Sequence, residues 1–142
     1  MIAGREEIVI LESSRSELGG AFQTIGALHQ KVGDQFETVT RVRWDEALQL
    51  LYAANGVLSG GVSTTVEQAP GRPRVAVFAM SQSGWGESLR IGLSIPAARL
   101  LLRCCAGALE YIDAPEFSTL TGAERSAIRH VMEILEGLGV DA

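Results

Sequence analysis

The fold of this chain is decided by one stretch, Ser88-Leu-Arg-Ile-Gly-Leu-Ser-Ile95 followed by Pro96-Ala-Ala-Arg-Leu-Leu-Leu-Arg-Cys-Cys-Ala-Gly-Ala-Leu-Glu-Tyr-Ile112. Apolar residues alternate with polar or small ones over its first half, which predicts a half-buried strand. Proline then suits the first turn of a helix, where its missing N–H would have no partner. The residues that follow are apolar on most sides, and their three charges, Arg99, Arg103 and Glu110, form one narrow stripe. The stretch therefore predicts a strand that leads into a buried central helix.

Patterns along the rest of the chain predict the other elements. We expect strands where apolar residues run together or alternate, and helices where they recur every three to four residues after a capping residue. Ser14 with Glu17, and Thr121 with Glu124, have the spacing of helix-capping boxes, and Asp45 is expected to cap a short helix. The predicted strands cover residues 7–12, 36–44, 62–67, 74–80 and 88–95, and the predicted helices cover 14–33, 46–55, 96–112 and 121–138.

The order of these elements is β-α-β-α-β-β-β-α-α. Connections between the later strands are short, which favours antiparallel pairing. We therefore predict an α+β fold, with a single mixed, mostly antiparallel sheet and helices mainly on one face. The length of 142 residues predicts one domain over 1–142.

Composition and charge exclude several classes of protein. The net charge of −5 argues against a sequence-independent nucleic-acid binder, which needs a basic surface. The most apolar stretch is interrupted by Arg99 and Arg103, and the N-terminal residues lack the pattern of a signal peptide. The only cysteines, Cys104 and Cys105, are adjacent and could pair only with strain. This predicts reduced, structural cysteines and a cytoplasmic location.

Motifs for catalysis, cofactors and metals are weak. The run from Gly56 to Ser63 has the glycine spacing of a phosphate-binding loop, but Val62 replaces the required lysine. Ser83 precedes a glycine in a turn but lacks the other glycine of a nucleophile elbow. The only histidines are His29 and His130, so a zinc site is not expected. We predict no cofactor and no metal.

Arginines and tryptophans supply the candidate binding residues. If helices cover one face of the sheet, the other face carries arginines beside an apolar strip from the strand over 74–80, a composition typical of protein-binding surfaces. A tryptophan between two glycines of a hairpin loop is a second candidate anchor, with two arginines at its rim. The predicted binding residues are Arg41, Arg43, Arg90, Trp44, Trp85 and Arg72.

Three functional hypotheses follow. The first is a small non-enzymatic protein-binding module, such as an immunity protein, antitoxin or inhibitor, or a self-associating subunit whose partner is another protein or a second copy. The second is a ligand-binding domain with a pocket between sheet and helices, lined by Trp44, Phe78 and Trp85. The third is a hydrolase-type enzyme that uses Ser83 or a histidine. Membrane and nucleic-acid partners are not expected.

Overall fold

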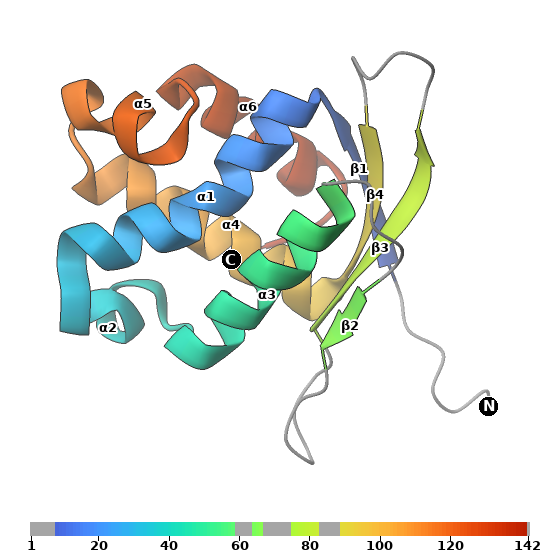
Figure 1. The fold of residues 1–142 in the computed structure, drawn as a ribbon, viewed down its shortest axis with the longest axis horizontal. Coiled ribbons are helices and arrows are strands. Elements are labelled where there is room, and N and C mark those ends of the chain that lie inside the picture. Colours follow the sequence, from blue (N-terminus) through green and yellow to red (C-terminus); the bar gives the residue numbers. More distant parts are fainter. Residues whose placement is uncertain (1–7, 59–63, 67–74, 83–88, 142) are drawn as a thin grey trace.

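The computed structural model describes residues 8–58, 64–66, 75–82 and 89–141. These residues form a sheet with a layer of helices against one of its faces (Figure 1). The α+β class predicted from the sequence is therefore confirmed. The apolar side chains buried between the sheet and the helices, and among the helices, form one core.

The sheet contains β1 (Ile8–Ser13), β2 (Thr64–Val66), β3 (Val75–Gln82) and β4 (Leu89–Ser94). Its strand order is β1-β4-β3-β2, so the first of the described strands is a neighbour of the last. Each pairing among the described strands is antiparallel, and none is parallel, which corrects the expectation of a mixed sheet.

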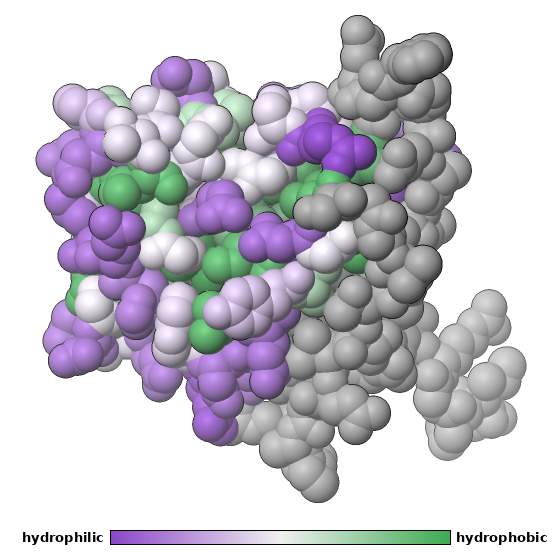
Figure 2. All heavy atoms as spheres, in the orientation of Figure 1, coloured by the Kyte–Doolittle hydropathy of each residue, from purple (hydrophilic) through white to green (hydrophobic). Residues whose placement is uncertain are grey.

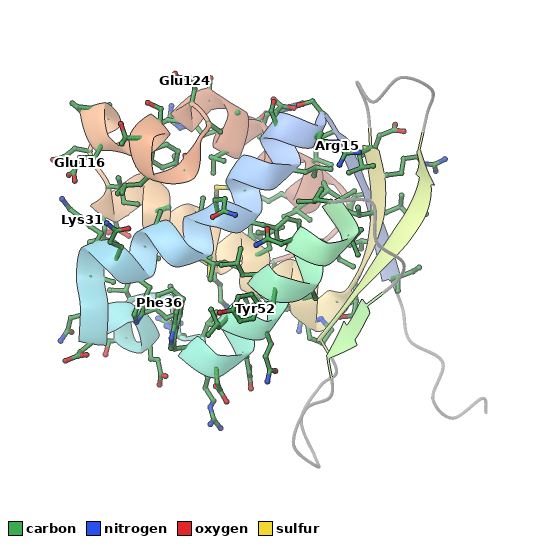
Figure 3. All side chains as sticks on the ribbon, in the orientation of Figure 1. Arg15, Lys31, Phe36, Tyr52, Glu116 and Glu124 are labelled. Carbon is green, nitrogen blue, oxygen red and sulfur yellow. The ribbon has the colours of Figure 1, made fainter. Side chains whose placement is uncertain are left out.

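The helical layer contains four longer helices, α1 (Arg15–Val32), α3 (Trp44–Leu58), α4 (Ile95–Tyr111) and α6 (Arg125–Gly137). Two shorter helices, α2 (Phe36–Thr40) and α5 (Ala114–Thr121), lie on the side of this layer that is remote from the sheet (Figure 1). A 3₁₀ turn over Gly33–Gln35 joins α1 to α2. The ion pair between Lys31 and Glu116, with Nζ and Oε1 2.5 Å apart, links the end of α1 to α5 (Figure 3).

Helix α4 is the buried central helix that the sequence predicts. It follows β4 without a loop, and the N–H of Ala97 donates a hydrogen bond to Oγ of Ser94 at 3.4 Å. Pro96 lies in the first turn, where no backbone N–H is needed. The helix packs against α1 and α6, and Leu101 has no exposed surface. The stripe of charged residues remains at its surface.

Helix α1 begins and ends where the sequence predicts, with Ser14 as its N-cap and Glu17 in its first turn. The N–H of Glu17 donates to Oγ of Ser14 at 3.1 Å, and Gly33 ends the helix with φ of 55°. The Glu17 carboxylate also accepts a hydrogen bond from the Ser13 hydroxyl and lies against the ring of His130. The first turn of α1 is thereby tied to α6.

The strand predicted over 36–44 is wrong, because these residues form α2 and a turn into α3. Phe36 and Thr40 lie one helical turn apart, both buried, and the Thr40 hydroxyl donates to the Phe36 carbonyl at 2.8 Å. Burial of this pair against the other helices overrides the alternating pattern. The next helix begins at Trp44, whose N–H donates to the Glu37 carboxylate at 3.1 Å, so Asp45 is not its cap.

The second predicted capping box is also wrong. Thr121 ends α5, a helix that the sequence did not predict, and its hydroxyl donates to the Phe117 carbonyl at 2.8 Å. Asp113 and Pro115 stand at the start of α5, and Gly122 ends it with φ of 77°. Helix α6 then begins after Glu124, which takes the N-cap position without a side-chain hydrogen bond.

Candidate functional site

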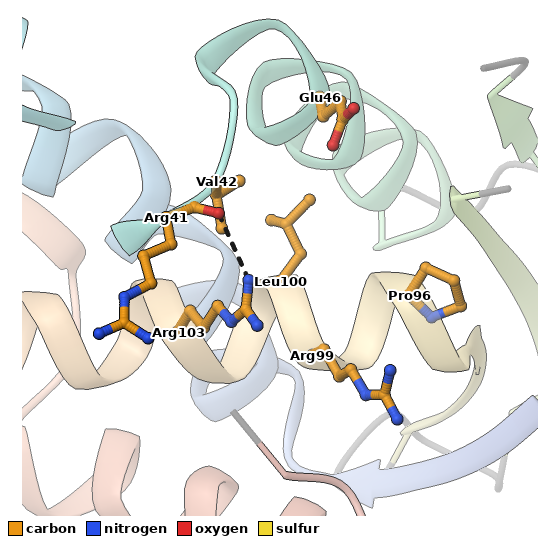
Figure 4. Close-up of a pocket in the computed structure, with 7 residues that line it drawn as sticks. All are labelled: Arg41, Val42, Glu46, Pro96, Arg99, Leu100 and Arg103. Atoms are coloured by element: carbon orange, nitrogen blue, oxygen red, sulfur yellow. Dashed lines mark hydrogen bonds between the residues drawn. The ribbon is translucent and has the colours of Figure 1, made fainter. Parts of the chain in front are cut away.

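A groove runs along the surface stripe of α4, between this helix and the segment that joins α2 to α3 (Figure 4). One part encloses about 200 Å³, and an adjoining part, which shares Arg41 and Arg103, encloses about 230 Å³. Between Pro96 and Glu110, α4 advances ~21 Å. We call the whole feature the arginine groove; its first part is lined by Arg41, Val42, Glu46, Pro96, Arg99, Leu100 and Arg103, and its second part adds Val39, Thr40, Ala106, Gly107 and Glu110.

The turn after α2 brings Arg41 against α4. Arg41 has φ of 59°, the left-handed conformation, and its N–H closes α2 by donating to the Glu37 carbonyl at 2.9 Å. Nη1 of Arg103 donates to the Arg41 carbonyl at 3.3 Å, although the two residues are 62 positions apart (Figure 4). A left-handed conformation is unfavourable for a residue with a Cβ. Contacts on both sides of the turn therefore hold this arginine in place.

Apolar side chains form the floor beneath the guanidinium groups. Val42 is 6% exposed and Leu100 is 5% exposed. The N–H of Val42 donates to the Thr40 hydroxyl at 3.1 Å, which fixes the backbone at this point. A ligand that enters the groove would therefore meet charge at the rim and an apolar surface below it.

The arginine groove is locally positive on an acidic protein. The first part has three arginines and one carboxylate, Glu46, while the whole chain has a net charge of −5. Nε of Arg99 lies 3.5 Å from Oδ1 of Asp141, whose side chain is 85% exposed, so water weakens this ion pair. Within the described part of the chain, no carboxylate is ion-paired with Arg41.

The predicted binding arginines do not share a surface. Arg41 and Arg43 lie beyond α2 and not on the sheet, which corrects their expected position, and only Arg41 lines the groove. Arg43 forms an exposed ion pair with Asp45 at 3.3 Å. Figure 2 shows mainly hydrophilic residues around the start of α3. Arg90 lies on β4, with Nε 3.6 Å from the Glu12 carboxylate on β1. Arg72 and Trp85 lie outside the described residues.

The predicted pocket between sheet and helices does not include Trp44. Its indole stacks on the ring of His29, with centroids 3.7 Å apart and planes inclined by 12°, and meets the edge of Phe36 at 5.1 Å. This aromatic cluster joins α1, α2 and α3 on the side remote from the sheet (Figure 3). The side chain of Phe78 and the whole of Trp85 lie outside the described residues.

The histidines have structural surroundings. His29 belongs to the aromatic cluster. Nδ1 of His130 lies 3.3 Å from both carboxylate oxygens of Glu17, and the Ser13 hydroxyl donates to the same carboxylate. These contacts lower the pKa of Glu17, the Ser13 hydrogen bond most strongly. The Glu17 carboxylate thus lies between the Ser13 hydroxyl and the His130 imidazole. A nucleophilic serine is activated by direct contact with its base, so this arrangement does not activate Ser13. Ser83 lies outside the described residues.

Both cysteines are free and buried in α4, as the sequence predicts. Burial raises the pKa of Cys105 to about 12 and that of Cys104 well above its ordinary value. Sγ of Cys105 lies 3.7 Å from the Thr24 hydroxyl on α1. High pKa values and burial make these thiols packing groups and poor nucleophiles.

The described ranges contain neither a cluster of metal ligands nor a membrane-spanning helix. In them, no three histidine, cysteine, aspartate or glutamate side chains gather as metal ligands would. Each helix in the same ranges is too short or too polar to cross a membrane.

The sequence identifies Arg99, Arg103 and Glu110 as the only charges of the central helix but does not predict that they line a groove. Their regular spacing was a usable signal, because charges retained on an otherwise buried helix mark its exposed face. The segment that faces them comes from an unrelated part of the chain. Compared with known proteins, the chain matches no protein-family model, no curated protein and no solved structure, so its function must be inferred from the groove itself.

Proposed function

We propose that this protein is a small, non-enzymatic protein-binding module that holds an acidic segment of a partner protein in the arginine groove. The observation that carries the proposal is the meeting of Arg41 with Arg99 and Arg103 over the apolar floor of Val42 and Leu100. Guanidinium groups bind carboxylates through paired, charge-assisted hydrogen bonds. Arginine beside buried apolar surface is also typical of residues that dominate protein–protein binding.

The length of the arginine groove favours a peptide segment over a small molecule. A peptide that lies over both parts, across the Arg103–Arg41 hydrogen bond between them, would follow ~21 Å of α4, roughly six residues of extended chain. The three arginines line the part that begins at Pro96, whereas Glu110 lies at the other end. The best ligand would therefore place its carboxylates near Arg99 and Arg41, an apolar side chain over Leu100, and a neutral or basic residue near Glu110.

We also propose that the protein works in a reducing compartment such as the cytoplasm. Both cysteines are free thiols buried in α4. Their burial leaves them as apolar packing groups, the usual state of cysteine in cytoplasmic proteins.

Peptide binding tests the proposed function. The probe is a fluorescein-labelled hexapeptide that alternates acidic residues with leucine, and its control has each acid replaced by the matching amide. Fluorescence anisotropy should show binding of the acidic peptide and much weaker binding of the amide peptide. Inorganic phosphate is added as a competitor, and the fraction of peptide that it displaces shows whether a simple anion occupies the same site.

Three variants locate the binding site. Arg99→Ala removes one guanidinium, and Arg41→Gly removes another at a left-handed position that glycine accepts. Each should weaken binding roughly tenfold, as expected for loss of a charge-assisted hydrogen bond. Arg43→Ala is the matched control, because it removes the same charge two residues away without changing the lining. Equal effects of all three variants, or full displacement by phosphate, would contradict the proposal.

A further inference from the structure

Strand β1 forms one edge of the described sheet. It pairs with β4 on one side, over all six of its residues, and no described strand pairs with its other side. An edge strand presents backbone N–H and C=O groups that can pair with another chain. Natural edge strands usually block such pairing with lysine, proline, a bulge or a charge that points inward.

Strand β1 carries none of these protections. Its sequence, Ile8-Val-Ile-Leu-Glu-Ser13, contains no lysine or proline, and its pairing with β4 has no break in register. Its only charge, Glu12, forms an ion pair with Arg90 of β4. On the face away from the helices, Ile8 is 42% exposed and Ile10 is 37% exposed. The edge is therefore regular and apolar, and the charge of Glu12 is already neutralised by Arg90.

We propose that a second copy of this chain pairs with β1, antiparallel and about a two-fold axis that passes beside Ile10. A closed dimer of this kind needs an axis perpendicular to the sheet, because only that operation makes the strands antiparallel and keeps both helical layers on one face. Residues opposite each other must then share a face of the sheet. Even-numbered residues of β1 therefore pair with even-numbered residues of the second copy.

Two registers satisfy this condition over five residues of β1, with either Ile10 or Leu11 at the axis. We choose the first, because it places the two exposed Ile10 side chains against each other, whereas Leu11 is buried against the helices. With Ile10 opposite Ile10 of the second copy, Ile8 lies opposite Glu12, and five of the six residues of β1 are paired. The two isoleucines at the axis cover each other, and Ile8 covers the aliphatic part of the opposite Glu12 side chain. Like charges do not face each other, because each Glu12 remains beside Arg90 of its own copy.

The dimer would join two four-stranded sheets into one sheet of eight strands. It uses a surface separate from the arginine groove, so the inference stands whether or not the proposed function is correct. If both hold, one particle presents two grooves. A partner with two acidic segments would then bind more tightly than either segment alone, because the second contact is intramolecular.

The mass in solution tests the dimer. Light scattering after size exclusion should give about twice the chain mass of 15.1 kDa for the natural protein. Ile10→Lys should give the single-chain mass with an unchanged circular dichroism spectrum, because two lysines would face each other at the axis. Tyr52→Lys is the control: this residue is 65% exposed on α3 and should leave the dimer intact (Figure 3). A natural protein of single-chain mass at every concentration overturns the proposal.

Disulfide trapping tests the register. Opposite residues of antiparallel strands lie roughly 4.5–5.5 Å apart at Cα, within the range that a disulfide spans. Ile10→Cys should therefore form a covalent dimer on mild oxidation. Ile8→Cys should not, because the two copies of residue 8 would be four residues out of alignment, about 13 Å. Cys104 and Cys105 are buried and give no background. A dimer that traps through residue 8, or that survives Ile10→Lys, also overturns the proposal.

Discussion

Gly20 of α1 packs directly against Ala123, in the turn between α5 and α6. A Cβ placed on Gly20 would lie 2.4 Å from the Cβ of Ala123, closer than real Cβ atoms approach, whereas one placed on Gly19 would meet nothing within 4 Å. The close approach lets α1 contact both C-terminal helices.

Gly20→Ala should destabilise the protein by about 1–3 kcal/mol, the usual cost of forcing an extra group into a packed contact. Gly19→Ala is the matched control in the same turn of helix. It should raise stability by up to about 1 kcal/mol, because alanine favours helix over glycine. Urea unfolding measures both variants, and equal effects would show that α1 does not approach the turn this closely.

Leu101→Ala should lower the free energy of unfolding by about 2–5 kcal/mol, since the side chain is wholly buried in the central helix. Leu138→Ala removes the same atoms from a side chain that is 46% exposed and should cost far less. Thermal unfolding of the two variants compares them directly. A small effect at Leu101 would contradict the central position of α4.

The contact of Glu17 with Ser13 and His130 should make stability depend on pH. Because the pKa of Glu17 is lower in the folded state, its contribution is present above the pKa of the unfolded chain and is lost as pH falls through the folded-state pKa. Glu17→Gln should therefore reduce stability at pH 7, and the difference from the natural protein should shrink in acid. Urea unfolding at several pH values measures this, with Glu133→Gln, an exposed residue of α6, as the control. A difference that does not change with pH would contradict the assignment.

The thiols of Cys104 and Cys105 should react with a thiol reagent only after unfolding. Burial keeps the reagent out, and the raised pKa values keep both groups protonated. Titration under native conditions should find almost no reactive thiol, and titration in denaturant without reductant should find two. Fewer than two in denaturant would show that the cysteines are oxidised or modified.

Asp141→Asn should strengthen binding of the acidic hexapeptide. Asp141 is the carboxylate beside Arg99, and its removal frees that guanidinium for the ligand. An exposed ion pair contributes about 0–1 kcal/mol, so the gain should be at most roughly fivefold. The effect should vanish in an Arg99→Ala background, which separates competition at Arg99 from a general change of net charge.

The parts of the fold that sequence predicts well are those with long, regular patterns. The strand and helix over 88–112, and the capped helix after Ser14, needed only periodicity and capping residues. The segment over 36–44 misled because alternating threonine, valine and aromatic residues favour a strand, while burial of Phe36 against Thr40 favours a helical turn. The secondary structure of such short segments is determined by the residues that pack against them.

The arginine groove also depends on tertiary packing that the sequence pattern does not reveal. The charges of α4 identified one wall, but the opposite wall depends on the left-handed turn at Arg41, which follows a helix that sequence did not predict. The sequence predicts Arg41 as a binding residue only by placing it on a strand, which the structure does not contain. Its position in the groove depends instead on the packing of α2 against α4.

The direct passage from β4 into α4 has a mechanical consequence. Ser94 is the last residue of the strand and the cap of the helix, so no flexible hinge separates Arg90 from Arg99. We therefore expect a shift of the strand to move the first turn of the helix with it. A force applied to the edge of the sheet would turn the row of guanidinium groups against the α2–α3 segment and change the width of the gap between them.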